Sequence, residues 1–168
     1  GYSAVTMRDL ATEMGIKAAS LYNHIDSKQD ILKSIIISLA EEFTDGMKII
    51  KKSDNNTIDK LKNIVILHVD ITTQNTYGMA SLNNDWMHLE DQLEHYLRLR
   101  KKYEQDFIDI IKSGINSNQI IDSNPEIIMF SILTTLRSLY LWIPKKEELN
   151  REMLSSQLSQ VLINGISN

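Results

Sequence analysis

The chain has 168 residues, no cysteine and a formal net charge of −4 at pH 7. This length suffices for one domain with a sizeable core, or for a domain that carries a small head. The lack of cysteine excludes disulfides and thiolate metal sites, and the acidic balance argues against a protein that coats nucleic acid without sequence preference. A small DNA-reading head on an acidic body stays possible, because salt screens phosphate attraction within about 8 Å.

Two short helices are predicted near the N-terminus, with a glycine between them. Thr6 and Asp9 have the spacing of a capping box, in which each side chain accepts a hydrogen bond from the other residue's backbone N–H. Gly15 suits the left-handed conformation that closes a helix, and Ile16 is expected to fill the corner behind it. The second helix, 17–25, has about two turns and is too short to be stable alone.

This pair of helices favours a helix-turn-helix, whose second helix enters the major groove while flanking groups hold phosphate. Residues 1–34 carry four basic and four acidic side chains, so the head is neutral, which is a point against DNA binding. The alternative is an ordinary helical hairpin with solvated polar side chains. If the head reads DNA, the expected contacts to bases and phosphates are Thr6, Arg8, Lys17, Ala18, Ser20, Tyr22, Asn23, His24 and Lys28.

Apolar residues at helical spacing through the rest of the chain predict an all-α fold. Ser27 and Asp30 repeat the capping pattern at the start of a longer helix, which should run out in the polar stretch 51–57. We expect a head with its connecting helix in 1–46 and an effector-binding and dimerisation domain in 47–168. Five positions mark further expected helix ends: Thr57 as a cap, a turn near Gly78, a stop near Gly114, a start at Asn124-Pro125 and an end at Pro144.

The stretch 127–143 is nearly all apolar but is too short for a membrane span, which needs about 20 residues, and it contains Arg137. A helix that is apolar on most sides in a water-soluble protein is usually buried on most sides. We therefore expect no membrane association, and a homodimer that forms through the last two helices. Arg137 needs a partner, either across the dimer or on an anionic ligand.

A ligand pocket in an all-α body lies between helices and is mostly apolar with a few polar groups. Packing in the core is the alternative role for each aromatic candidate. A metal site is not expected, because the helix should break near Leu89 and scatter the acidic, amide and histidine side chains of 85–95. No cofactor is expected. The candidate effector-binding residues are His68, Trp86, Tyr96, Arg100, Tyr103, Phe130 and Arg137.

The run "GYSAVTMRDLATEMGIKAASLYNHIDSKQDIL" resembles the head of the TetR family of one-component transcriptional repressors, most closely in "SLYNHIDSKQDIL". The resemblance implies that Lys17, Ala18, Tyr22 and His24 lie on the recognition helix, that Lys28 grips phosphate and that Thr6 caps the supporting helix. Lys17 stands where the family often has serine, and Ile25 replaces the usual phenylalanine. Relatives carry one more helix before the position of Gly1, so we expect the natural chain to begin earlier.

The body resembles the branch of this family that controls lipid and steroid breakdown, through an Arg-x-x-Tyr-Glu pattern at 100–104 and a closing helix that ends in "NG". The resemblance implies a cytoplasmic repressor, released from a palindromic operator by a small molecule such as an acyl-CoA or another lipid-like compound. No catalytic triad, P-loop, Rossmann or zinc motif is visible, so an enzyme is not expected. The alternative is an effector-sensing or protein-interaction module that does not bind DNA.

Overall fold

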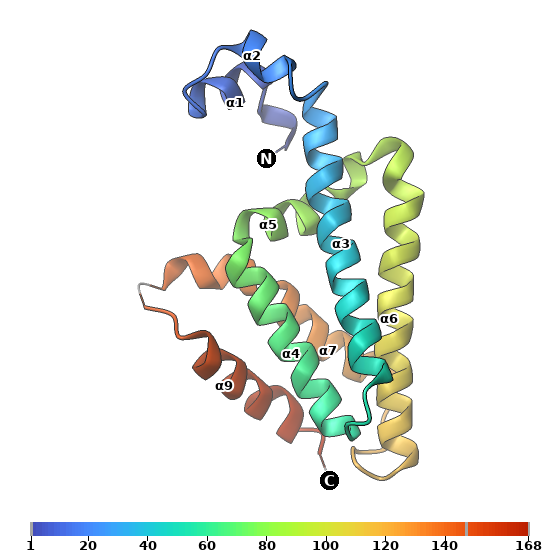
Figure 1. Ribbon diagram of the computed structural model, residues 1–168. Helices are drawn as coiled ribbons and strands as arrows, with labels where there is room; N and C mark the ends of the chain where they lie inside the picture. Colours follow the sequence, from blue (N-terminus) through green and yellow to red (C-terminus); the bar gives the residue numbers. More distant parts are fainter. Residues whose placement is uncertain (1, 147, 168) are drawn as a thin grey trace.

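The computed structural model describes residues 2–146 and 148–167 and confirms the all-α fold. A small head stands at one end of the molecule, and a long helix joins it to the body, with the C-terminus at the opposite end (Figure 1). The head and the joining helix contain η1 (Tyr2–Ala4), α1 (Met7–Glu13), α2 (Ala18–Tyr22) and α3 (Lys28–Lys52).

The local signals in the head are largely confirmed. Asp9 N–H donates to Thr6 Oγ1 at 3.2 Å, and Thr6 N–H donates to Asp9 Oδ2 at 2.8 Å, which completes the capping box. Gly15 has φ of +67° and closes α1 as expected. The role given to Ile16 is wrong, because its side chain is 38% exposed. The corner is instead filled from the helices themselves, by Met7, Ala11 and Leu21.

Helix α3 is the mechanical link between head and body. It begins after Ser27, whose hydroxyl accepts from the backbone N–H of Asp30, and it continues without a break to Lys52. Position 46, the expected domain boundary, therefore lies inside this helix. Its last turns carry Met47 and Ile50 into the core of the body, so that α3 belongs to both parts.

The body packs α4, α6 and α7 with the lower part of α3 around one core, whose most buried members include Phe107, Ile111, Ile64 and Leu136. Helix α9 packs along α4, and α3 lies along α6. The bounds are α4 (Thr57–Gln74), α5 (Thr76–Asn84), η2 (Trp86–His88), η3 (Glu90–Gln92), α6 (Leu93–Asn116), α7 (Pro125–Arg137), α8 (Leu139–Trp142), η4 (Ile143–Lys145) and α9 (Arg151–Asn164).

Several expected helix ends are displaced. The cap of α4 is Asn56 and not Thr57, and the turn expected at Gly78 lies at Asn75, whose side chain caps α5 by accepting from the Gly78 N–H. The stop expected near Gly114 is confirmed, because α6 ends at Asn116. The start at Asn124-Pro125 is confirmed. The helix that was expected to run from there to Pro144 ends earlier. Helix α7 stops at Arg137, and after Ser138 a separate short helix, α8, begins.

The apolar segment Pro125–Lys145 is long and apolar enough to cross a membrane by composition alone. It is not one straight helix, since it comprises α7, α8 and η4, and Arg137 lies in its middle. Only 28% of its most apolar window is buried, so the expectation of burial on most sides is not met within one chain. The large apolar side chains left exposed here and on α9 are Ile127, Phe130, Leu141, Trp142, Met153 and Val161.

Candidate DNA-binding head and ligand cavity

The head presents polar side chains on and around α2, which is shorter than expected at five residues. Asn23 and His24 therefore follow this helix and do not lie on it. Of the two neighbouring alanines, Ala18 is half-buried against the head core and Ala19 is exposed. The predicted contacts that are exposed to solvent are Thr6, Arg8, Lys17, Ser20, Tyr22, Asn23 and His24.

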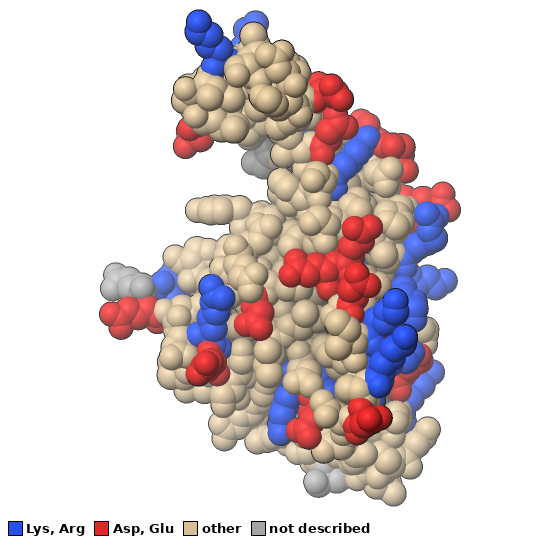
Figure 2. Space-filling model, viewed as in Figure 1, with Lys and Arg blue, Asp and Glu red and all other residues tan. Residues whose placement is uncertain are grey.

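Lys28 is half-buried and bonded within the head, and its role as a phosphate ligand stays a prediction. Its ammonium donates to the carbonyl oxygens of Tyr2 and Val5, both at 2.8 Å, and lies 4.1 Å from the centroid of the Tyr2 ring. These carbonyls bring the N-terminal segment against α3, so Lys28 would have to leave them to reach DNA. Arg8 and Lys17 are the exposed cations of the described head, and Figure 2 shows Lys and Arg side chains at its end farthest from the body.

A short segment between α5 and α6 contacts the head from the body. The Gln29 side-chain amide donates to the carbonyl oxygen of His88, and the Tyr2 ring stacks on the His88 ring with centroids 5.3 Å apart. Lys33 on α3 pairs with Asp91, and this carboxylate raises the pKa of the lysine. The segment Trp86–Gln92 thus holds the head and the upper part of α3 together.

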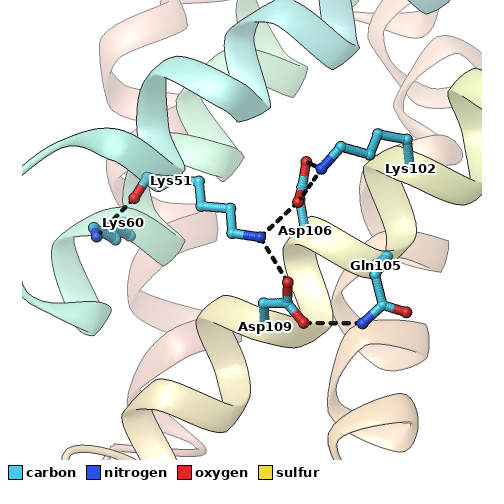
Figure 3. A network of polar contacts seen from close by, with 6 residues as sticks. All are labelled: Lys51, Lys60, Lys102, Gln105, Asp106 and Asp109. Carbon is cyan, nitrogen blue, oxygen red and sulfur yellow. Dashed lines mark hydrogen bonds and ion pairs between the residues drawn. The ribbon is translucent and has the colours of Figure 1, made fainter.

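The other end of α3 is fixed to α6 by a network of charged side chains (Figure 3). Lys51 Nζ lies 2.7 Å from Asp106 Oδ1 and 2.6 Å from Asp109 Oδ2. Lys102 approaches both oxygens of Asp106, at 2.6 and 2.7 Å. Asp106 is almost fully buried, so its charge depends on these two lysines for compensation.

A cavity of about 280 Å³ lies in the body among α3, α4, α5, η2, α6 and α7. Six of the seven predicted effector residues line it, and the seventh, Phe130, does not: its side chain is 66% exposed on the outer side of α7. Helical periodicity alone could not say which side of α7 faces the body. The residues that line the cavity are Ala40, Phe43, Thr44, His68, Met79, Leu82, Asn83, Trp86, Tyr96, Leu99, Arg100, Tyr103, Leu133 and Arg137.

Two arginines share one carboxylate at this cavity. Arg100 Nε lies 3.1 Å from Glu104 Oε1, and Arg137 Nη2 lies 3.0 Å from the same oxygen. Arg137 therefore has an ionic partner in its own chain, Glu104, and does not need the salt bridge across a dimer that the sequence suggested. The cluster keeps one excess positive charge. The Arg100 guanidinium also lies 5.8 Å from the Trp86 ring, and that ring stacks on Tyr96.

His68 forms the buried part of the cavity wall, with 3% of its surface exposed. Its Nε2 lies 2.8 Å from the hydroxyl of Tyr103, and its ring packs against Phe43 with centroids 4.6 Å apart. Burial, with a smaller effect of the Arg137 charge, lowers the pKa of His68 to about 3, so the ring is neutral near pH 7. Burial also raises the pKa of the Tyr103 hydroxyl.

The expected helix break between 85 and 95 is confirmed, because two short 3-10 turns separate α5 from α6. Among the described residues no group of three His, Asp or Glu side chains is placed to hold a metal ion. Sequence reasoning missed several cavity residues, among them Phe43 and Met79. Their helical spacing reads as ordinary core, and no feature of the sequence separates a core position from a cavity wall.

Comparison with known proteins adds a family match to this geometry. Residues 54–166 match a family described as "Tetracyclin repressor-like, C-terminal domain", and residues 1–35 match "Bacterial regulatory proteins, tetR family". The chain is 19% identical over 170 residues to the HTH-type transcriptional repressor KstR2 of Mycolicibacterium smegmatis, an alignment that covers 99% of this chain and 83% of that protein.

Solved structures with the same fold include the ketosteroid transcriptional regulator KstR2 of Mycobacterium tuberculosis. The match has a TM-score of 0.92 at 19% identity and covers 100% of this chain and 87% of that one. AibR in complex with isovaleryl coenzyme A and operator DNA matches with a TM-score of 0.74 at 18% identity, and the match covers 97% of this chain and 89% of that one.

Proposed function

Because the chain belongs to the TetR family of bacterial regulatory proteins, we propose that it represses transcription from a palindromic operator and is released when a small molecule fills its cavity. Members of this family are transcriptional regulators and not enzymes, and the chain is a ligand-responsive DNA-binding regulator. One observation carries the proposed coupling: in the segment Trp86–Gln92, Trp86 lines the cavity and His88 contacts the head.

A ligand can move the head through this segment. Trp86 forms part of the cavity wall, and two residues later His88 holds Tyr2 and Gln29 of the head. A ligand that displaces Trp86 would shift these contacts, while Lys51 keeps the far end of α3 fixed on α6. The result would be a tilt of α3 that is largest at the head. By linkage, DNA must weaken ligand binding by the same factor by which the ligand weakens DNA binding.

DNA recognition is proposed for the exposed side of α2 and its flanks. Lys17 and Arg8 supply charge for phosphates, and Ser20 can bond base edges or phosphate. Tyr22 at the end of this helix and His24 just after it can donate to the DNA backbone. Two such helices read successive major grooves when a dimer holds them about 34–36 Å apart, or at a multiple of that distance.

A homodimer through α7 and α9 is proposed because large apolar side chains are exposed there. Phe130 on α7 is 66% exposed and Val161 on α9 is 74% exposed. An apolar patch of this kind in a water-soluble protein marks an interaction surface, and a second copy would cover it with the same patch. A protein that binds operator DNA works in the bacterial cytoplasm, which is the location we propose.

An acyl-CoA or another lipid-like acid is the proposed effector. The cavity combines apolar walls with the excess positive charge of Arg100 and Arg137, a combination that suits an apolar body with an anionic group. Two relatives support this class by what they are reported to bind or regulate, since one is a ketosteroid regulator and the other was solved with isovaleryl coenzyme A.

The test begins with a selection of duplexes from a random pool by the full-length protein. We expect a palindrome, bound in a fluorescence-anisotropy titration, with affinity about tenfold lower in Lys17→Ala because a phosphate or base contact is lost. A panel of acyl-CoA thioesters and free fatty acids is then added, and at least one member should release the DNA. If no palindrome is recovered, or Lys17→Ala and Tyr22→Ala bind like the wild type, the head does not read DNA, and the chain is a sensing or interaction module.

A further inference from the structure

One buried polar atom of a residue that lines the cavity has no protein partner among the described residues. Within the described residues, His68 Nδ1 makes no hydrogen bond, although the residue is 3% exposed and its other ring nitrogen is bonded to Tyr103. Buried polar atoms are paired in the great majority of cases, so an unpaired one in a cavity wall calls for an explanation. A ligand group that forms a hydrogen bond with Nδ1 would explain why the protein leaves this atom unpaired.

The protonation of the ring follows from counting donors. A neutral imidazole carries one N–H. If it sat on Nε2, the Tyr103 hydroxyl proton would lose its acceptor and Nδ1 would be a second unsatisfied atom. If it sits on Nδ1, the hydroxyl of Tyr103 donates to Nε2, and only the Nδ1–H lacks a partner. The second arrangement leaves fewer groups unsatisfied, so His68 offers a hydrogen-bond donor and requires an acceptor.

The polar side chains of the cavity wall differ in depth. His68 is buried, whereas the side chains of Arg100 and Arg137 are 36% and 34% exposed. Apolar side chains, including Phe43, Met79 and Leu133, form the wall of the same cavity. A ligand that satisfies all three parts has an uncharged oxygen at its inner end, an apolar middle and an anion at its outer end.

We infer that this regulator selects an anionic effector that carries an oxo group at the end opposite its charge, and that His68 is the residue that recognises the oxo oxygen. This inference rests on the proposed function of the cavity as the effector site. It narrows the effector class, because a plain saturated acid leaves the Nδ1–H unsatisfied and is selected against. A carboxylate and a coenzyme A thioester can both supply the outer anion.

The test compares three probes by isothermal titration calorimetry on the full-length protein without DNA. They are a medium-chain acid with an oxo group next to its far end, the unsubstituted acid of equal length, and the methyl ester of the oxo acid. We expect the oxo acid to bind about tenfold more tightly than the unsubstituted acid, as one completed buried hydrogen bond implies. The methyl ester should bind more weakly than the oxo acid. The coenzyme A thioesters of both acids form a parallel pair, in which the same oxo preference is expected.

His68→Phe keeps a ring of similar shape and removes the donor, so it should bind both acids alike. Thr72→Val is the matched control: Thr72 Oγ1 is also buried and unpaired, one turn along α4, but Thr72 does not line the cavity. It should retain the oxo preference. Tyr103→Phe frees Nε2 and releases the ring from its fixed tautomer, so the preference should fall in this variant without loss of the His68 side chain.

Equal affinity of the wild-type protein for the oxo and the unsubstituted acids would overturn the inference, as would failure of all probes to bind or a preference that persists in His68→Phe. The wild-type comparison needs no variant, so a misfolded mutant does not decide the outcome. Operator release is measured separately. If the oxo preference holds and no probe changes DNA affinity, the inference about the cavity stands and the proposed regulatory coupling fails.

Discussion

The charged network at the lower end of α3 allows a quantitative test of how this helix is held. In Asp106→Ala, the buried carboxylate that bonds Lys51 and Lys102 is removed, and both ammonium groups lose a partner. The matched control is Lys102→Ala, which removes one contact and leaves Asp106 paired with Lys51.

The expected magnitude follows from exposure. The Asp106 side chain is 3% exposed, whereas those of Lys51 and Lys102 are 36% and 61% exposed. Hydrogen bonds to buried charges contribute about 1.5–3 kcal/mol, but the lysines can turn to water, and removing the carboxylate also removes its desolvation cost. We expect Asp106→Ala to lower the free energy of unfolding by about 2 kcal/mol, and Lys102→Ala to lower it by less than about 1 kcal/mol.

Urea unfolding at fixed protein concentration measures both values. With an m-value of about 2 kcal/mol/M, the midpoint of Asp106→Ala should fall by about 1 M at unchanged m. Burial pushes the pKa of Asp106 up, but the hydrogen bonds from Lys102 and Lys51 outweigh it and hold the pKa below its ordinary value. The contribution of this carboxylate is therefore complete above about pH 4 and is lost as the pH falls through the lower, folded-state pKa.

The stability gap between the wild-type protein and Asp106→Ala should accordingly narrow in acid. Equal destabilisation by Asp106→Ala and Lys102→Ala would refute the view that the buried carboxylate organises the network. So would a gap that stays constant as the pH is lowered well below 4, because it would mean that the charge of Asp106 does not stabilise the fold.

Three further outcomes are expected. Tyr22→Ala should weaken operator binding about tenfold in anisotropy titrations, while Tyr77→Ala, at a body side chain that is 90% exposed, should not; equal values would remove Tyr22 from the interface. Val161→Asp places a charge on the proposed dimer surface and should give monomers in light scattering, whereas a surviving dimer would place the interface elsewhere. A Cβ at Gly114 would lie 2.5 Å from a neighbouring side chain, so Gly114→Ala should cost about 1–3 kcal/mol in thermal unfolding, and Gly165→Ala, with 3.8 Å of room, should be nearly neutral; similar costs would contradict this.

Features that depend on neighbouring residues in the chain could be predicted from the sequence. The capping box of Thr6 and Asp9, the left-handed Gly15 and the helix start at Asn124-Pro125 are all found where the residue types require them. Each is decided within one turn of backbone, so tertiary packing has little scope to override it.

Features that depend on distant residues were missed. The carbonyl oxygens that accept from Lys28 belong to Tyr2 and Val5, which are 26 and 23 positions away in the chain. No local sequence pattern predicts these contacts. Phe130 is an aromatic residue at helical spacing, as a cavity residue would be, but it lies on the exposed side of α7. His68, Arg100 and Arg137 do line the cavity, because a buried or half-buried histidine or arginine needs polar surroundings, and the body supplies them there. Their role in effector binding stays a prediction.

Reciprocal binding tests the proposed coupling between cavity and head most directly. The dissociation constant of an effector probe is measured by calorimetry with free protein and with protein saturated by its operator, and the operator constant is measured with and without the probe. Coupling through the segment Trp86–Gln92 predicts two equal factors, each of about fivefold or more. An effector that binds free and DNA-bound protein with the same affinity would contradict it, because such a ligand cannot shift the equilibrium between the two states.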